Sequence, residues 1–328
     1  MDRSGKLKKI GSALLGILLI ALAIYSGFRF LEATVFLEDE ESPSKAPSKT
    51  IVVDGVKYFP KQDIETFLII GVDEEGEMVR RDTLDNEGMA DAVMLAVFDK
   101  TNEKINIVSL NRDTMTDISV RGLDGRKVDS VTAQLALSYA YGDGMKTSCE
   151  NTAEAVSKML RGVEIDHFMA LNMDAIKILN DAVGGVTVDV VDDFSRVDSS
   201  IPMGSVTLHG DQALTYIRAR KDVADQLNVT RMKRQQEYMK NFFYELKDAV
   251  VADSDFAVKN YEELTKYMAT DCSITTMSSM LERYGAYELG EIIIPEGENV
   301  RGEKYMEFYL DEDSFEDLIL EYFFAEKQ

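Results

Sequence analysis

The sequence predicts an α/β protein in which a mixed central β-sheet is flanked by helices as an αβα sandwich, behind a single N-terminal transmembrane helix. Three observations lead to this prediction. An uncharged apolar run lies near the N-terminus. Further along, shorter apolar runs are bounded by polar turns, which is the pattern of buried strands. Segments with helical spacing of apolar residues alternate with these runs, as they do when helices cover a sheet.

The apolar run has the features of a membrane anchor. Residues 10–28 carry no charge, and the run is about long enough to cross a bilayer as a helix. A cleaved signal peptide is the alternative, but its apolar region is usually shorter and ends in small residues, whereas aromatic residues end this one. Basic residues precede the run and favour a cytoplasmic N-terminus. We therefore expect a cytoplasmic tail over 1–9, a single-pass helix over 10–30 and an extracytoplasmic C-terminal domain.

A linker is predicted to separate the anchor from the folded domain. Residues 31–62 include EDEESPSKAPS, which mixes acidic residues with serine and proline and has no apolar periodicity. The domain itself is predicted over 63–328. Its motifs fall in a core over about 66–250, and a helical C-terminal extension is expected over 251–328.

Composition excludes some classes of function. The net charge of -23 argues against a nucleic-acid partner, because such affinity comes mainly from cations that neutralise phosphates. His167 and His209 are the only histidines, which removes most His-based catalytic schemes. The only cysteines are Cys149 and Cys272, and outside the cytoplasm a disulfide between them is expected, with two isolated buried thiols as the alternative.

Strands are predicted at the apolar runs. The turn DKTNEK separates two of them by a few polar residues, which favours an antiparallel hairpin and hence a sheet of mixed direction. The predicted strands are residues 66–73, 91–99, 104–110, 167–172, 186–190 and 291–295.

Helices are predicted where apolar residues recur at helical spacing. Asn151 and Glu154 have the spacing of a capping box, and Gly184 follows another helical segment as a stop signal. The predicted helices are residues 131–141, 151–160, 173–183, 211–220, 231–247, 257–268 and 314–324.

Two acidic residues flank the predicted hairpin. Asp91 opens one strand, while Arg112 and Asp113 directly follow the other. Because the start of one hairpin strand lies beside the end of its partner, Asp91 and Asp113 are expected to converge. Carboxylate pairs suit Mg²⁺ bound to phosphate, and Arg112 adds a planar donor fork for the same phosphate. The spacing leaves equally open that both acids only cap turns.

Basic residues gather in one stretch of this acidic chain, YIRARKDVADQLNVTRMKRQQEY at 216–238. Arg218 and Arg220 project to one side if the helix end is frayed or extended. Arg231 is predicted to begin the next helix, one turn before Gln235, where backbone N–H groups also favour an anion. A pyrophosphate could accept several of these donors at once. The alternative is a solvated basic face paired with nearby acidic residues.

The order of the motifs resembles the LytR-CpsA-Psr (LCP) family. The matching blocks, FLIIGVD, ADAVMLAVFD, VSLNRDT, SYAYGDG, EIDHFMALNMDAI, NDAVGGVTVDV, LHGDQALTYIRARK and TRMKRQQEY, cover about residues 66–247. The resemblance implies an Mg²⁺-dependent phosphotransferase of a Gram-positive type cell envelope. Such a ligase moves a teichoic acid or capsular polysaccharide from undecaprenyl pyrophosphate to peptidoglycan through a phosphodiester. It implies a membrane-lipid partner and an apolar cavity for the polyprenyl tail, for which the apolar positions of VTAQLALSYAY and MKNFFYEL are the candidates, ordinary core being the alternative.

The resemblance also assigns roles to residues. Asp91 and Asp113 match the metal-associated acids, Arg112 matches the arginine of the RDT motif, and all three are the catalytic candidates. The pyrophosphate-binding candidates are Arg112, Arg218, Arg220, Arg231 and Gln235. The sequence departs from the family pattern where a lysine, an asparagine, an aspartate and a glycine are common, at Gln134, Ala136, Asn228 and Thr230. These departures keep two alternatives open: a non-catalytic binder of lipid pyrophosphate or wall polymer, and a polyprenyl-pyrophosphate-sugar pyrophosphatase.

Overall fold

The structure of the chain is a computed structural model. It describes residues 49–326 except 82–87, 123, 220, 224–227, 254–255, 257–259, 261–262 and 286. The predicted membrane helix over 10–30, the first part of the predicted linker and Arg220 therefore lie outside the described residues. No helix in the described part of the chain is long and apolar enough to cross a membrane.

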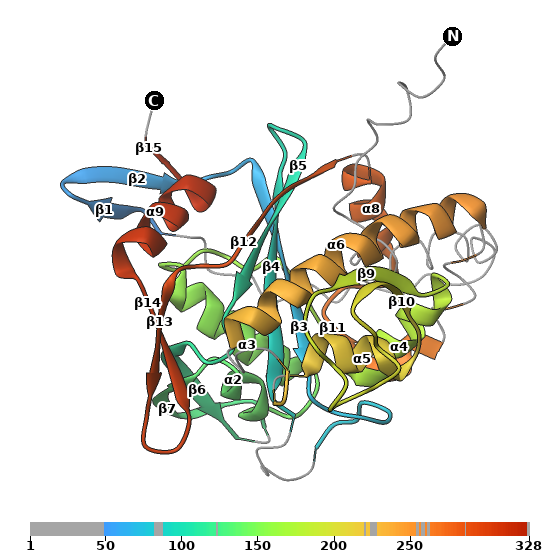
Figure 1. The fold of residues 1–328 in the computed structure, drawn as a ribbon. Coiled ribbons are helices and arrows are strands. Elements are labelled where there is room, and N and C mark those ends of the chain that lie inside the picture. The colour runs from blue at the N-terminus through green and yellow to red at the C-terminus, as the bar shows by residue number, and fades with distance from the viewer. Residues whose placement is uncertain are drawn as a thin grey trace.

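A six-stranded sheet forms the centre of the molecule (Figure 1). Its strands, in spatial order, are β11 (Met268–Thr270), β8 (His167–Leu171), β3 (Ile64–Val72), β4 (Ala90–Asp99), β5 (Lys104–Leu110) and β12 (Glu288–Ile293). Strands β4 and β5 form the predicted antiparallel hairpin, whereas β8 joins β3 and β12 joins β5 in parallel. The prediction of a mixed sheet is confirmed.

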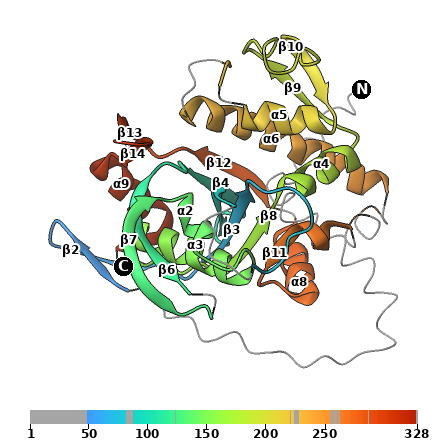
Figure 2. The ribbon, with the colours of Figure 1, turned by 90° about the horizontal axis from the view of Figure 1, so that it is seen from below.

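Helices cover both faces of this sheet. Alternate side chains of a strand point to opposite faces, so Phe67 of β3 packs into one core and the adjacent Leu68 packs into the other. Figure 2 shows α5 and α6 on one side of the central strands and α2 and α3 on the other. The Phe67 face carries α4 (Met173–Ala182), α5 (Asp211–Arg218), α6 (Asn228–Ala252) and α8 (Ile274–Tyr284), and the Leu68 face carries α2 (Leu137–Ala140), α3 (Lys146–Met159) and α9 (Glu312–Phe323).

Smaller sheets surround the sandwich. They are formed by β1 (Ile51–Val53) with β2 (Val56–Pro60) and β15 (Phe324–Glu326), by β6 (Met115–Arg121) with β7 (Lys127–Gln134), by β9 (Val186–Val190) with β10 (Gly204–Leu208), and by β13 (Gly297–Arg301) with β14 (Met306–Leu310). Strands β1 and β2 correct the predicted linker, because its end from residue 51 on is part of the folded domain. Pairing of Pro60 with Phe324, near the other end of the chain, holds them there.

The predicted helical extension over 251–328 also needs correction. It contributes β11 and β12 to the two edges of the central sheet, and β13 and β14 form a separate antiparallel ribbon. The predicted helix over 257–268 falls partly outside the described residues. Its last residues form a short 3₁₀ helix, Thr265–Tyr267, and then Met268 begins β11. The physical reason is that Met268 to Thr270 pair with β8, a partner about a hundred positions away in the sequence.

Two predictions around the helices α2 and α3 were wrong. Residues 131–134 belong to β7, because they pair with β6, and only Leu137–Ala140 is helical. Helix α3 begins at Lys146, so Asn151 lies inside it and caps nothing. The Asn151 amide is buried and donates to the carbonyl oxygens of Ser119 and Ser138 at 2.8 and 2.6 Å.

The two cysteines are not joined by a disulfide, contrary to the expected pair. They belong to opposite sides of the central sheet. Cys149 is buried in the core under α3, where its Sγ lies 3.8 Å from the Ala269 carbonyl oxygen. Cys272 packs against the core of the other face. The sheet between them prevents the short Cβ–Cβ approach that a disulfide requires.

Candidate functional site

The predicted site residues gather at one end of the central strands. Strands β3 and β5 both run antiparallel to β4, so their carboxyl ends lie beside the amino end of β4. Asp73 follows β3, Arg112 follows β5, and Asp91 is the second residue of β4. Ligand sites of α/β sheets commonly lie outside the carboxyl ends of strands.

A β-bulge sets the position of Asp91. Ala90 pairs with Val72 and Ala92 pairs with Gly71, so Asp91 is the extra residue on its strand. A bulge turns the extra residue's side chain out of the regular alternation. The Asp91 carboxylate consequently meets two guanidinium groups: Arg112 donates to its Oδ1, and Arg231 Nη1 donates to its Oδ2 at 3.3 Å.

A tight turn after β5 positions Arg112 and Asp113. The Asn111 side chain accepts a hydrogen bond from the Asp113 amide at 3.0 Å, and the Thr114 amide donates to the Asn111 carbonyl oxygen at 3.0 Å. Asp113 is buried, and its Oδ1 lies 3.5 Å from Arg112 Nε. The guanidinium of Arg112 thus contacts both acids, and the predicted convergence of Asp91 with Asp113 is what the structure shows.

Gln134 connects this turn to the C-terminal ribbon. From the end of β7 its amide donates to Asp113 Oδ1 at 3.0 Å and to the carbonyl oxygen of Met306 at 2.7 Å. The Phe308 amide also donates to the Asp113 carbonyl oxygen, at 2.9 Å. The sequence pointed to Gln134 only as a departure from a family pattern, whereas in the structure its amide joins Asp113 to the β13–β14 ribbon.

The basic stretch divides into residues that reach the site and residues that stabilise the fold. Arg231 is buried against Asp91, and Arg218, at the end of α5, donates to Asp73 Oδ1 at 2.6 Å. Helix α6 begins at Asn228, so Arg231 lies within its first turn and does not begin it. Asp73 was missed by the sequence reasoning, although it follows a buried strand just as Asp113 does.

Two other polar residues of α6 point away from the two acids. Gln235 donates to the carbonyl oxygen of Ile217 at 3.1 Å. Arg234 donates to Asp192 Oδ2 at 2.8 Å, and its guanidinium lies 5.3 Å from the centre of the Phe194 ring. Glu237, an acidic residue of the same stretch, accepts from the Tyr216 hydroxyl at 2.9 Å. Burial, followed by this hydrogen bond, raises the pKa of the Tyr216 hydroxyl.

An apolar cavity of about 110 Å³ begins beside the bulge. Gly71 and Ala92, the residues that pair next to Asp91, line it together with Gln235. Its wall on α6 includes Met239 and Phe242, which come from the stretch MKNFFYEL. The other candidate stretch for a lipid tail, VTAQLALSYAY, contributes instead to the core on the opposite face of the sheet.

A second cavity, of about 280 Å³ and polar, adjoins Arg112 and Asp113. Gln134 forms one wall, and the tip of the β13–β14 ribbon forms another with Arg301 and Lys304. The apolar cavity therefore lies beside the bulge that carries Asp91, and the polar cavity is lined by Arg112 and Asp113.

The donor set at Asp91 and Asp113 fits an Mg²⁺ ion. Carboxylate oxygens are the hard donors that Mg²⁺ takes from proteins, usually one or two at a time. Both carboxylates contact the guanidinium of Arg112, Asp91 at Nη1 and Asp113 at Nε. An ion at this position would share the carboxylates with Arg112 and Arg231.

Comparison with known proteins gives one family. The chain matches the LytR_cpsA_psr family over residues 29–317. A curated relative from Bacillus mycoides (strain KBAB4), the polyisoprenyl-teichoic acid–peptidoglycan teichoic acid transferase TagU, is 28% identical over 209 residues. That alignment covers 64% of this chain and 61% of the relative, so the match spans less than two thirds of the relative's length.

Solved structures share the fold. The Lin1025 protein of Listeria innocua is 26% identical, with a TM-score of 0.53, over 79% of this chain and 96% of that one. A structure of TagT bound to LIIa-WTA is 18% identical, with a TM-score of 0.59, over 79% of this chain and 89% of that one. At that identity the second match shows the fold alone.

Proposed function

Because the chain belongs to the LytR_cpsA_psr family, we propose that it is an extracytoplasmic phosphotransferase, anchored by residues 10–30, that attaches a wall glycopolymer to peptidoglycan. The donor is a polyprenyl-pyrophosphate-linked polymer of the teichoic acid or capsular polysaccharide type. One observation carries the proposal: Asp91 holds arginines from two distant motifs, Arg112 and Arg231, directly beside an apolar cavity.

The donor is proposed to bind across this boundary. Its pyrophosphate would replace Asp91 as the acceptor for Arg112 and Arg231, and it would replace Asp73 as the acceptor for Arg218. The reason is that a guanidinium group forms paired, charge-assisted hydrogen bonds to phosphate oxygens. Its apolar tail would enter the cavity lined by Met239 and Phe242. At about 110 Å³ the cavity is smaller than the roughly 300–1,000 Å³ of typical ligand pockets. A long tail must therefore widen it, which the flexible methionine side chains in its wall permit.

The reaction proceeds by attack of an acceptor sugar hydroxyl on the phosphorus next to the glycopolymer. A new O–P bond forms, the pyrophosphate P–O bond breaks, and polyprenyl phosphate departs with the negative charge. Arg112 and Arg231 stabilise that charge where it develops, because they are held in place before the substrate arrives. Asp91 or Asp113 accepts the proton of the hydroxyl. Asp91 and Asp113 would hold an Mg²⁺ ion, which would supply further positive charge beside the reacting phosphate.

The polar cavity suits the acceptor. It is lined by Arg112 and Asp113, so a saccharide held there would lie beside the guanidinium group proposed to bind the reacting phosphate. In-line displacement needs the attacking and leaving oxygens on opposite sides of the phosphorus, and the acceptor hydroxyl is proposed to attack from this cavity. Arg301 and Lys304 add positive charge to the lining of this cavity.

The test uses the full chain in detergent with a polyprenyl-pyrophosphate glycan, peptidoglycan fragments and Mg²⁺. Mass spectrometry scores two products, glycan joined to peptidoglycan by a phosphodiester and polyprenyl phosphate. Arg231→Ala should lower the rate of joining by about 10²–10³, the usual effect of removing one donor that stabilises developing charge. Arg126→Ala is the matched control, because that arginine is largely exposed and forms an ion pair with Asp124, which is also exposed.

The outcomes separate the alternatives. Joined product that requires Arg231 supports the transferase. Polyprenyl phosphate released without joined product, even at high acceptor concentration, identifies a pyrophosphatase. Donor that binds and stays intact identifies a non-catalytic binder.

A further inference from the structure

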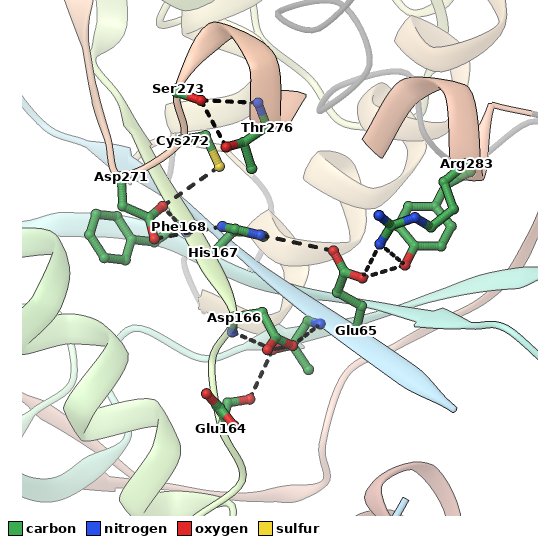
Figure 3. A network of polar contacts seen from close by, with 12 residues as sticks. Glu65, Glu164, Asp166, His167, Phe168, Asp271, Cys272, Ser273, Thr276 and Arg283 are labelled. Atoms are coloured by element: carbon green, nitrogen blue, oxygen red, sulfur yellow. Dashed lines mark hydrogen bonds and ion pairs between the residues drawn. The ribbon is translucent and has the colours of Figure 1, made fainter. Parts of the chain in front are cut away.

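A second cluster of potential ligands lies at the other end of the central strands from Asp91. His167 opens β8, and Asp271 and Cys272 directly follow β11, which pairs antiparallel with β8. The imidazole Nδ1, a carboxylate oxygen and the thiol Sγ all lie within 4.8 Å of one another. Figure 3 shows the three side chains directed toward a common point, with Glu65 of β3 on the other side of the imidazole from Asp271.

We propose that His167, Asp271 and Cys272 bind a divalent transition-metal ion, with Zn²⁺ as the ion best matched by their chemistry. Imidazole nitrogen and thiolate sulfur favour zinc and its neighbours, while Mg²⁺ and Ca²⁺ prefer oxygen donors throughout. Three protein ligands and one water molecule complete a tetrahedral shell. The site is separate from the proposed transferase site and does not depend on that function.

The distance between His167 and Asp271 fits a shared ion better than a direct hydrogen bond, and the Cys272 thiol is hydrogen-bonded to the same carboxylate. His167 Nδ1 lies 3.7 Å from Asp271 Oδ2, and Cys272 Sγ lies 3.7 Å from Asp271 Oδ1. In a tetrahedral zinc site with the usual bond lengths, neighbouring ligand atoms are about 3.4–3.6 Å apart. A nitrogen–oxygen distance of 3.7 Å is too long for a hydrogen bond. Small side-chain shifts would therefore complete the site.

The imidazole is oriented as a metal-binding histidine should be. Its Nδ1 is buried and makes no hydrogen bond to any residue that the structure describes. Its Nε2 faces Glu65 Oε1 at 3.9 Å, on the far side of the ring. Metal-binding histidines usually direct their second nitrogen at a carboxylate, which fixes the tautomer and strengthens the ligand.

The surrounding residues hold these groups in place. Asp271 Oδ1 accepts a hydrogen bond from the Phe168 amide at 2.9 Å, which leaves Oδ2 directed at the imidazole. Glu65 Oε2 accepts from Arg283 Nη1 at 3.0 Å and from the Tyr284 hydroxyl. Arg283 and Tyr284 belong to α8, so an ion would tie β11 and α8 to the sheet.

The expected effect of the ion is structural. Strand β11 has only three residues and lies at the edge of the sheet. Cys272 precedes Ser273, whose side chain accepts from the Thr276 amide at 3.0 Å at the start of α8. Binding at Cys272 would therefore fix the connection between this edge strand and α8.

The test titrates the full chain, in detergent and excess Mg²⁺ after treatment with a chelator, with Co²⁺ and then with Zn²⁺. We expect one Co²⁺ per chain, with the absorption band of a thiolate–cobalt bond, and displacement by Zn²⁺. Cys272→Ser and His167→Ala should abolish the band, whereas the controls Cys149→Ala and His209→Ala should retain it. Glu65→Gln should weaken binding by about 10–100-fold as a partner of the imidazole.

Thermal unfolding supplies an independent readout. Zn²⁺ should raise the Tm of the wild-type protein and of both controls, and it should leave the Tm of Cys272→Ser unchanged. The proposal is overturned if the wild-type chain gives no thiolate–cobalt band. It is equally overturned if the band and the rise in Tm persist in Cys272→Ser.

Discussion

Replacing Gln134 by alanine tests how the ribbon supports the site. The substitution removes the hydrogen bonds to Asp113 Oδ1 at 3.0 Å and to the Met306 carbonyl oxygen at 2.7 Å. A hydrogen bond to a charged acceptor contributes about 1.5–3 kcal/mol to the free energy of unfolding, and a hydrogen bond to a neutral acceptor contributes about 0.5–1.5 kcal/mol. The expected loss of stability is therefore about 2–4 kcal/mol.

The expected loss corresponds to a fall in Tm of roughly 4–8 °C for a domain of this size. Because the chain has no tryptophan, circular dichroism is the suitable probe of unfolding. Transferase activity should fall at temperatures where the variant is still folded, because Asp113 loses a group that positions it. Gln134→Lys should keep both properties closer to the wild type, since an ammonium group can donate to the same two acceptors.

Gln62→Ala is the matched control for Gln134→Ala. Its side chain is exposed and donates a hydrogen bond to the Pro60 carbonyl oxygen, two residues away, at 3.1 Å. We expect a change in Tm close to zero. An equal Tm for Gln134→Ala and the wild type, together with equal activity, would refute the positioning role of Gln134.

Three further predictions concern charge, the basic stretch and the apolar cavity. Burial raises the pKa of Glu154, but hydrogen bonds from Lys158 and Ser119 outweigh burial and lower this pKa to about 2 from an ordinary 4.5. The lowered pKa stabilises the folded state above about pH 4.5, and this stabilisation is lost as the pH falls toward 2. Thermal unfolding between those pH values should show a smaller acid-induced loss of Tm in Glu154→Gln than in the wild type, and equal losses would contradict the assignment. Arg234→Ala should destabilise the fold by about 3–5 kcal/mol, since it breaks a buried ion pair. Arg218→Ala should mainly lower activity and change the free energy of unfolding by only about 0–1 kcal/mol. The reverse pattern in Tm and rate would contradict the division of the basic stretch. Gly71→Val should raise the KM for a long-chain donor more than for a short-chain donor, because even a Cβ there would lie 3.1 Å from the Ala92 Cβ, and equal effects on both donors would exclude the cavity as the tail site.

The predicted strands followed from local patterns. Residues 104–110 form β5 with the predicted bounds, and 91–99 differ from β4 by one residue at the start. Continuous apolar runs bounded by polar turns are consistent with buried strands, and the short length and β-branched residues of these two runs favour strands over helices. The hairpin between them, and with it the approach of Asp91 to Arg112, followed from one short polar turn.

Other elements were out of reach of such patterns. Strand β7 is largely exposed, so its residues carry no apolar stripe, and only pairing with β6 makes it a strand. Strands β1 and β2, by contrast, carried a local signal that the predicted linker overlooked, because β-branched and aromatic residues flank the Asp54–Gly55 turn between them. Only their pairing with β15, from the far end of the chain, required the tertiary structure. A disulfide was expected from composition alone, yet Cys149 and Cys272 lie on opposite faces of the sheet.

The sequence by itself determined the chemical identities of the site: two acids, their arginines and the neighbouring apolar residues, each set by a short local motif. Tertiary structure alone decided which arginine contacts which acidic residue. Arg231 and Arg234 are three positions apart on α6, yet one contacts Asp91 and the other contacts Asp192. The reason is physical: a buried guanidinium must find an acceptor. Which acceptor is within reach depends on a bulge in β4 and on the packing of α6 against the sheet, neither of which is encoded in a local pattern.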